Sequence, residues 1–217
     1  MSEHPQRAWS TGSGSPNIWS YDRISGLYDA TIEHLSRQVR REAVGELGPG
    51  AGDRLLLVGV GSGLDLPYLP RGTRGLGVDL SAGMLAAGER RLAALDLPGF
   101  ELRQMDARSL DLPDGSFDAV YLPLIVTVVR DGERVMEEAA RVAKPGARLV
   151  VADRFWPEGR ERPLLARRAS ALLGRFAMHF DRRFSEMHAG APHLELLGHR
   201  HTSPRGFFDL VTLRKPG

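Results

Sequence analysis

The chain has 217 residues, 42% hydrophobic and 26% charged, which is typical of one globular domain with its own core. A formal net charge of +2 gives no indication of nucleic-acid binding, and no apolar stretch approaches the roughly 20 residues of a membrane-spanning helix. Cysteine is absent, which excludes disulfides and thiolate metal sites. Residues 1–16 are polar and lack the apolar stretch of a secretory signal, so we expect a cytoplasmic protein with a flexible N-terminal tail.

A long amphipathic helix is predicted after this tail. Apolar side chains recur at steps of three and four residues from Ile18 to Val44, and Gly48-Pro49-Gly50 ends the pattern. Tyr21 and Tyr28 lie seven residues apart, which places them on one face of this helix. Such a pair either packs in a core or an interface, or covers a binding pocket with one hydroxyl near a ligand.

The next feature is a glycine-rich turn at the end of a predicted buried strand, residues 55–60. Gly59, Gly61 and Gly63 form this turn, and a second predicted strand ends at Asp79, 20 residues after Gly59. Glycines let the backbone approach a ligand closely, and a carboxylate can accept two hydrogen bonds from a ribose diol. The arrangement is typical of a nucleotide-type site, although a glycine turn that binds nothing is the simpler alternative.

Strands and helices alternate after this turn, and two extended runs joined by residues 202–206 predict a terminal hairpin. The pattern predicts an α/β fold over residues 17–217: a three-layer Rossmann-like sandwich with a mainly parallel seven-stranded sheet and a C-terminal antiparallel hairpin. The predicted strands are 55–60, 75–79, 100–105, 117–122, 147–152, 193–201 and 207–214, and the predicted helices are 64–69, 81–95 capped by Ser81, and 131–143 capped by Asp131.

Four blocks together resemble the class I S-adenosylmethionine-dependent methyltransferases. The G-x-G-x-G spacing of the turn agrees with that family, whereas a dinucleotide site has the pattern G-x-G-x-x-G and would place its last glycine at Leu64. An oxidoreductase is therefore the weaker alternative. The blocks are Val58-Gly59-Val60-Gly61-Ser62-Gly63, Gly77-Val78-Asp79-Leu80-Ser81 with Met84-Leu85, Met105-Asp106-Ala107 followed by Leu112-Pro113-Asp114-Gly115-Ser116-Phe117-Asp118, and Ala140-Arg141-Val142-Ala143-Lys144-Pro145-Gly146-Ala147-Arg148-Leu149.

This resemblance implies S-adenosylmethionine as the cofactor and a role for each matching residue. The glycines would pack against its methionyl part, Asp79 would bind the ribose hydroxyls, and Asp106 with the Ala107 amide would bind adenine. Each of these acids is otherwise a simple strand-end or turn residue, and Met84 is otherwise a core residue. Tyr121 and Leu122 would lie over the sulfonium. The complete set implied for the cofactor is Gly59, Val60, Gly61, Gly63, Asp79, Leu80, Met84, Asp106, Ala107, Tyr121 and Leu122.

One position departs from the family pattern. An acid that helps to hold the cofactor's amino group usually ends the first strand, and this chain has Leu57 there. Asp65, at the start of the following predicted helix, is a candidate substitute. The departure also keeps open a different class of function, a non-catalytic protein that binds the cofactor as a regulator.

Methyl transfer needs a base only where the acceptor arrives protonated, as an amine does at neutral pH. The candidate catalytic residues are Tyr28, Tyr21 and Asp153, which follows the fifth predicted strand; Asp153 is otherwise a cap. A histidine is a further candidate base. His199 and His201 share one face of a strand, but without a convincing third ligand we expect no metal.

A narrower resemblance concerns the acceptor. Ile125-Val126-Thr127-Val128-Val129-Arg130-Asp131, the pairs Tyr21-Asp22 and Tyr28-Asp29, and the arginine-rich stretch after Asp153 are similar to bacterial phosphatidylethanolamine N-methyltransferases and quinone C-methyltransferases. The resemblance implies the amine of phosphatidylethanolamine as the first acceptor, and a soluble or quinone-like small molecule as the alternative. The sequence does not indicate an oligomeric state.

The segment from Arg154 to Arg183 carries eight arginines and three acids. Within it, residues 163–180 predict a helix with an apolar stripe flanked by arginines. Three interpretations of this helix are open: it packs on the domain, it covers the acceptor pocket, or it lies on an anionic membrane surface. On such a surface each arginine contributes about 1 kcal/mol to the free energy of membrane binding. If the acceptor is a phospholipid, we expect the protein to contact the inner face of the membrane peripherally.

Overall fold

The structure is a computed structural model, and it describes residues 36–50, 52–161, 181–202 and 207–217. Several expectations lie outside these residues: the flexible tail, Tyr21 and Tyr28, and the apolar helix over residues 163–180. The predicted helix after the tail is described over residues 36–47, where it ends just before Gly48. Gly48 has a φ of 52°, and its N–H bonds the carbonyl of Val44, which is the geometry of a glycine helix stop.

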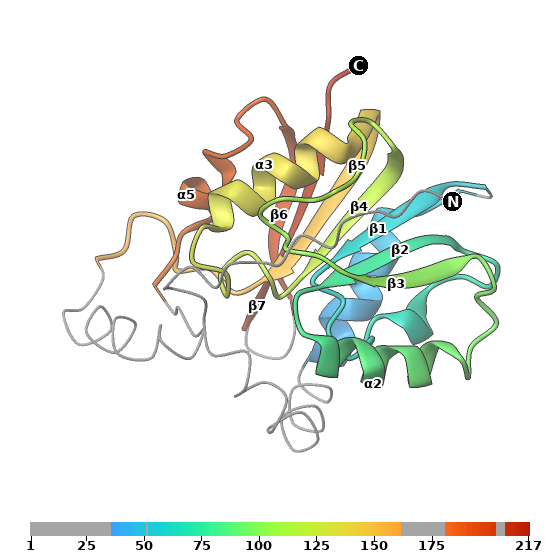
Figure 1. Ribbon diagram of the computed structural model, residues 1–217. Coiled ribbons are helices and arrows are strands. Elements are labelled where there is room, and N and C mark those ends of the chain that lie inside the picture. Colours follow the sequence, from blue (N-terminus) through green and yellow to red (C-terminus); the bar gives the residue numbers. More distant parts are fainter. Residues whose placement is uncertain (1–35, 51, 162–180, 203–206) are drawn as a thin grey trace, which may run out of the picture.

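Seven strands form a single mixed sheet in the order β3-β2-β1-β4-β5-β7-β6 (Figure 1). The first five strands in this order are parallel to one another, while β7 runs antiparallel to both β5 and β6. The fold class predicted from the sequence is therefore confirmed. The strands are β1 (Arg54–Val58), β2 (Arg74–Asp79), β3 (Phe100–Gln104), β4 (Phe117–Pro123), β5 (Ala143–Asp153), β6 (Glu195–Thr202) and β7 (Phe208–Arg214).

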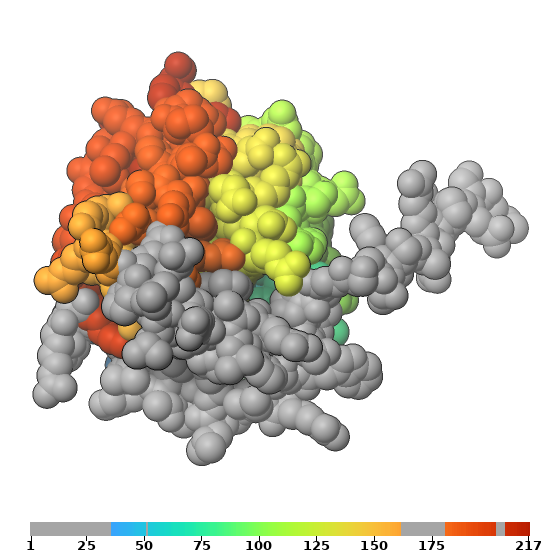
Figure 2. All heavy atoms as spheres, turned by 90° about the vertical axis from the view of Figure 1, so that its left-hand side faces the viewer, coloured from blue at the N-terminus to red at the C-terminus, as the bar shows by residue number. Residues whose placement is uncertain are grey.

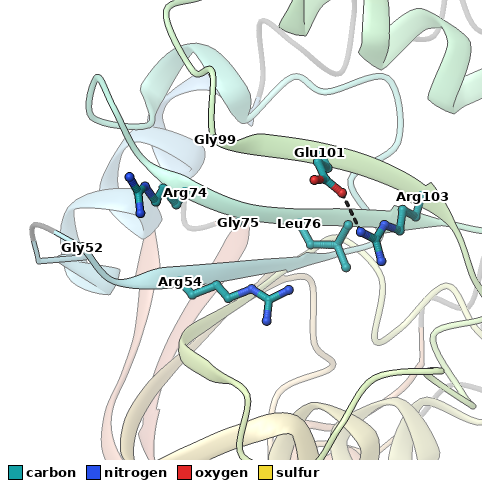
Figure 3. Close-up of a pocket in the computed structure, with 8 residues that line it drawn as sticks. All are labelled: Gly52, Arg54, Arg74, Gly75, Leu76, Gly99, Glu101 and Arg103. Carbon is teal, nitrogen blue, oxygen red and sulfur yellow. Dashed lines mark hydrogen bonds and ion pairs between the residues drawn. The ribbon is translucent and has the colours of Figure 1, made fainter.

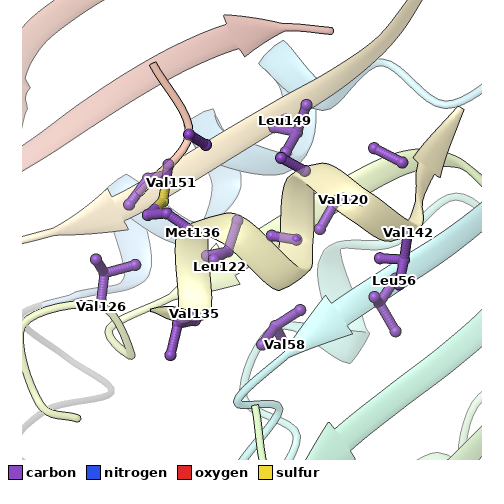
Figure 4. Packing of buried hydrophobic residues seen from close by; sticks show 14 of the residues in the cluster. Leu56, Val58, Val120, Leu122, Val126, Val135, Met136, Val142, Leu149 and Val151 are labelled. Carbon is purple, nitrogen blue, oxygen red and sulfur yellow. The ribbon is translucent and has the colours of Figure 1, made fainter. Parts of the chain in front are cut away.

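Strand alternation divides the core into two layers, one on each face of the sheet. Leu56 and Val58 of β1 point to one face, where α3 (Gly132–Val142) covers the central strands (Figure 4). Leu55 and Leu57 point to the other face, against the helix over residues 36–47 and α2 (Ala82–Leu92). On the first face, α5 (Phe184–His188) lies beside α3, and Figure 2 shows the two segments in contact at the surface.

Two predicted helices differ from those observed. The helix expected over residues 64–69 is reduced to a single 3-10 turn, η1 (Leu66–Tyr68), because Pro67 and Pro70 leave no room for a longer one. The helix that begins after Ser81 ends at Leu92 rather than near residue 95, because the chain closes with i→i−3 bonds. Ser81 does cap this helix, since its hydroxyl accepts from the Met84 N–H at 3.2 Å.

The other differences concern α3, β5 and α5. Asp131 occupies the N-cap position of α3 but makes no capping hydrogen bond; its carboxylate accepts from Arg108 at 3.3 Å instead. β5 begins at Ala143, four residues earlier than predicted, because Ala143 pairs with Phe117 before a register shift. The short helix α5 was not predicted, and its His188 stacks on Phe184 with ring centroids 5.3 Å apart.

Candidate active site

The glycine-rich turn lies directly after β1, at the edge where the parallel strands end. Gly59, Gly61 and Gly63 all have positive φ, of 78°, 54° and 78°, a conformation that strongly favours glycine. A Cβ on Gly59 would lie 2.8 Å from the Ile125 side chain, and one on Gly63 would lie 2.7 Å from Leu66. At Gly61 a Cβ would meet no atom of the described residues within 4 Å, so within the described structure this backbone borders open space. A ligand can therefore lie closely along the turn at Gly61.

Asp79 ends β2 beside this turn and faces the same edge. Its carboxylate accepts from the backbone N–H groups of Gly61 and Ser81, each at 2.9 Å. Burial raises the pKa of Asp79, and no cationic side chain among the described residues opposes this effect. Because two oxygens offer about four acceptor positions, the carboxylate retains capacity for hydroxyl donors. These properties suit a ribose diol.

Asp106 follows β3, but its carboxylate is already engaged. The Arg108 side chain donates to both of its oxygens, with the shortest contact at 2.7 Å, and the Arg108 N–H donates at 2.9 Å. These hydrogen bonds lower the pKa of Asp106. The neighbouring Ala107 is buried. An adenine amino group would therefore have to share this carboxylate with Arg108.

Tyr121 and Asp65 lie in a buried polar network on the face that the helix over residues 36–47 covers. The Tyr121 hydroxyl donates to Asp65 at 2.9 Å, and the Arg40 guanidinium also donates to Asp65. Burial raises the pKa of Asp65, and the Arg40 charge opposes that effect. The charge of Asp65 is thus compensated within the protein, so the structure gives no support for Asp65 as a substitute for the acid missing at Leu57.

The remaining residues implied for the cofactor differ in exposure. The Leu80 side chain is 36% exposed beside Asp79, which leaves apolar surface for a ligand at this edge. Met84 is half-buried in the first turn of α2. Val60 and Leu122 are buried in the two opposite core layers, Val60 with α2 and Leu122 beneath α3. Any contact of Leu122 with the sulfonium would therefore come from its backbone.

The loop after β4 borders the site and is held from two directions. Leu124 has a φ of 51°, and among the described residues no other non-glycine residue has a positive φ. The buried Asp153 accepts from the Thr127 hydroxyl at 2.6 Å and the Thr127 N–H at 3.0 Å. Arg182 donates to the carbonyls of Val126, Val129 and Arg130.

The sequence reasoning missed the roles of Leu124, Thr127 and Arg182, because no local pattern reports strain or a contact between distant segments. Asp153 was predicted as a catalytic residue. Burial raises its pKa, but its hydrogen bonds all come from Thr127 and nearby backbone N–H groups. This geometry indicates that Asp153 positions the loop after β4.

His199 and His201 both contact the same Asp209 oxygen, each with a ring nitrogen at 2.9 Å. Asp209 is buried and faces Asp153 across the β5–β7 pair. In the part of the chain that the structure describes, no group of three or more histidine and acidic side chains has the geometry to hold a metal ion.

The family described as "Methyltransferase domain" matches residues 56–151, the segment that contains the glycine turn, Asp79 and Asp106. A phosphatidylethanolamine N-methyltransferase of Cereibacter sphaeroides is 36% identical over 201 residues, which cover 90% of this chain and 96% of that relative. A demethylmenaquinone methyltransferase of Renibacterium salmoninarum is 36% identical over 138 residues, which cover 61% of this chain and 56% of that relative.

Among solved structures, phosphoethanolamine N-methyltransferase 2 of Haemonchus contortus, in complex with S-adenosyl-L-methionine, has a TM-score of 0.69. It is 15% identical, and the match covers 94% of this chain and 61% of that one, so it supports the fold. The chain belongs to the class I S-adenosylmethionine-dependent methyltransferases. It is therefore an enzyme that uses S-adenosylmethionine, and the alternatives of a non-catalytic regulator and an oxidoreductase are set aside.

The residues at the carboxyl edge fit this cofactor, since Gly61 borders open space and Asp79 keeps acceptor capacity. When bound, S-adenosylmethionine supplies a methyl group activated by a positively charged sulfur. The protein has to align the acceptor with that methyl group and exclude water, so proximity provides most of the acceleration. Hydrogen bonds to Asp153 and from Arg182 hold the loop after β4 at the border of this site.

Proposed function

We propose that this methyltransferase methylates the amine of phosphatidylethanolamine. The observation that carries the proposal is the extent of the match to the phosphatidylethanolamine N-methyltransferase, which spans 90% of this chain and 96% of that relative. The acceptor-binding parts of methyltransferases lie largely outside the shared cofactor motifs, so similarity over the whole length bears on the acceptor.

A second candidate acceptor is a demethylmenaquinone-like quinone. Several relatives named demethylmenaquinone methyltransferase have similar identity, between 32% and 37%, although their matches cover 61–64% of this chain. These shorter matches support the cofactor-binding part more than the acceptor-binding part.

For the site we propose two groups of residues. Gly59, Val60, Gly61, Gly63, Asp79, Leu80, Met84, Asp106, Ala107, Tyr121 and Leu122 form the surroundings of the cofactor, with Asp79 on the ribose. Tyr28 and Tyr21 remain the proposed catalytic residues at the acceptor, where one hydroxyl would help to remove the proton of an amine. Asp153 is retained with them as a positioning residue, because its hydrogen bonds are directed to Thr127.

We also propose that the protein contacts the membrane peripherally, at the inner face. No helix in the described ranges is long and apolar enough to cross a membrane. The excess of arginine between Arg154 and Arg183 supports attraction to anionic lipid. Sedimentation with anionic vesicles, reversed by high salt, is the expected behaviour; absence of sedimentation at low ionic strength would contradict membrane contact.

The acceptor is tested with purified enzyme, S-adenosylmethionine carrying a labelled methyl group, and vesicles of phosphatidylcholine and phosphatidylglycerol. One set of vesicles also contains phosphatidylethanolamine, and a matched set contains demethylmenaquinone. Label in a phospholipid whose mass has increased by one or more methyl groups supports the first candidate. Label in the quinone alone supports the second and refutes the first. A Tyr28→Phe variant should lower kcat without weakening binding of S-adenosylhomocysteine.

A further inference from the structure

A second pocket lies away from the candidate active site, on the face of β1, β2 and β3 (Figure 3). Its volume is about 280 Å³. Arg54 and Arg74 are the first residues of β1 and β2, so the pocket lies at the amino ends of these strands. The glycine turn follows their carboxyl ends, and the stretch from Arg54 to Gly59 spans roughly 16 Å. The lining residues are Gly52, Arg54, Arg74, Gly75, Leu76, Gly99, Glu101 and Arg103.

Among the described residues, no helix covers this part of the sheet. The connection between β3 and β4, residues 105–116, forms turns rather than a helix. Arg54 and Arg74 pair in register on β1 and β2, and Glu101 pairs with Leu76 of β2. The register thus places charged residues of three neighbouring strands along one face, with the Arg54 and Arg74 side chains extending toward different ends of the pocket (Figure 3).

Positive charge exceeds negative charge in this pocket. The lining contains three arginines and one acid, Glu101, which pairs with Arg103 at 2.6 Å. The Arg54 guanidinium lies over the Phe117 ring, 4.7 Å from its centroid, and this contact leaves its N–H donors available. Within the described ranges, the guanidinium groups of Arg54 and Arg74 have no carboxylate partner.

We propose that this pocket binds a phosphate group. Guanidinium groups present paired N–H donors that match phosphate oxygens, and two arginines without carboxylate partners supply the charge. The volume of about 280 Å³ leaves room for a phosphate or diphosphate group between the two arginines. Arg103 would add a third contact if its guanidinium group left the ion pair with Glu101 and bound the phosphate instead. The site is separate from methyl transfer, and its test does not depend on the acceptor.

The first test measures binding of inorganic pyrophosphate by isothermal titration calorimetry at low ionic strength. Arg74→Gln and Arg54→Gln should each weaken binding about fivefold, as expected for the loss of an exposed charge-assisted contact. Glu101→Gln should strengthen binding by a similar factor, because it removes the negative charge and frees Arg103. The matched control is Arg90→Gln on α2, an exposed arginine outside the pocket, which should leave the affinity unchanged.

Opposite effects of Arg74→Gln and Glu101→Gln cannot arise from a general loss of structure. Thermal unfolding of each variant identifies any that is misfolded, and the two exposed residues Glu101 and Arg103 contribute little to stability. Wild-type affinity in Arg74→Gln and Arg54→Gln, or weaker binding in Glu101→Gln, would overturn the proposal.

The source of the phosphate group is distinguished by a second arm with phosphatidylcholine vesicles that contain phosphatidic acid. If the same variants change sedimentation with these vesicles in the same order, the ligand is a lipid headgroup. If they change pyrophosphate binding alone, the ligand is a soluble phosphate compound.

Discussion

Gly61→Ala provides a direct test of the cofactor position. A Cβ at Gly61 would meet none of the described residues within 4 Å, so against these residues the substitution costs only the strain of a φ of 54°, about 1–2 kcal/mol. That cost corresponds to a fall in melting temperature of about 2–8 °C for a chain of this size. With the cofactor along the turn, the added methyl group occupies its space. Overpacking of this kind costs about 1–3 kcal/mol, or roughly 5- to 150-fold in affinity.

The matched control for this variant is Gly72→Ala. Gly72 also has a positive φ, of 75°, and a Cβ there also meets nothing within 4 Å, but it lies in the turn before β2, away from the site. Both variants should therefore lose similar stability in thermal unfolding. Calorimetric titration with S-adenosylhomocysteine should show weaker binding in Gly61→Ala alone. Equal affinity in the two variants would refute the placement of the cofactor along the glycine turn.

Three further predictions address the carboxylates. Asp79→Asn should weaken S-adenosylhomocysteine binding about hundredfold in the same titration, because two charge-assisted hydrogen bonds to the ribose contribute roughly 3 kcal/mol. Arg40→Met should lower the unfolding free energy in urea by about 3–5 kcal/mol, since it leaves the buried Asp65 charge unpaired. Adding Asp65→Leu should recover only part of the loss, because the buried Tyr121 hydroxyl then loses its acceptor. Arg108 lowers the pKa of Asp106, so this stabilisation is present above the unfolded pKa near 3.8 and is lost as pH falls through the lower folded value. Arg108→Gln should therefore be less stable than wild type at pH 6, and the free energies of unfolding of the two proteins should converge near pH 2.

The fold was predictable because each of its determinants is local. Apolar runs such as residues 55–58 mark buried strands, and Gly59 and Asp79 stand at the ends of two of them. Parallel strands bring their carboxyl ends to one edge, so the glycine turn and the acid become neighbours without any further information. The hydrogen bond from the Gly61 N–H to Asp79 agrees with this reasoning.

The polar networks were not predictable, because their members are far apart in the chain. Asp65 suggested a cofactor ligand from its place after the glycine turn, but its partners Arg40 and Tyr121 lie 25 and 56 residues away. The competition of Arg108 for Asp106 is local, yet it depends on side-chain conformations that spacing does not report. Residue type and spacing therefore locate a carboxylate, while its free acceptor capacity depends on the folded arrangement.

Leu57, the next-to-last residue of β1, has a consequence for charge at the site. Leu57 is fully buried in the layer beneath the helix over residues 36–47, where an acid would need its own cationic partner. The chain instead places a carboxylate at Asp65 and supplies that partner with Arg40. The cofactor's ammonium group therefore gains no full negative charge from either residue. We therefore expect the affinity contributed by Asp79 at the ribose to be a larger share of the total.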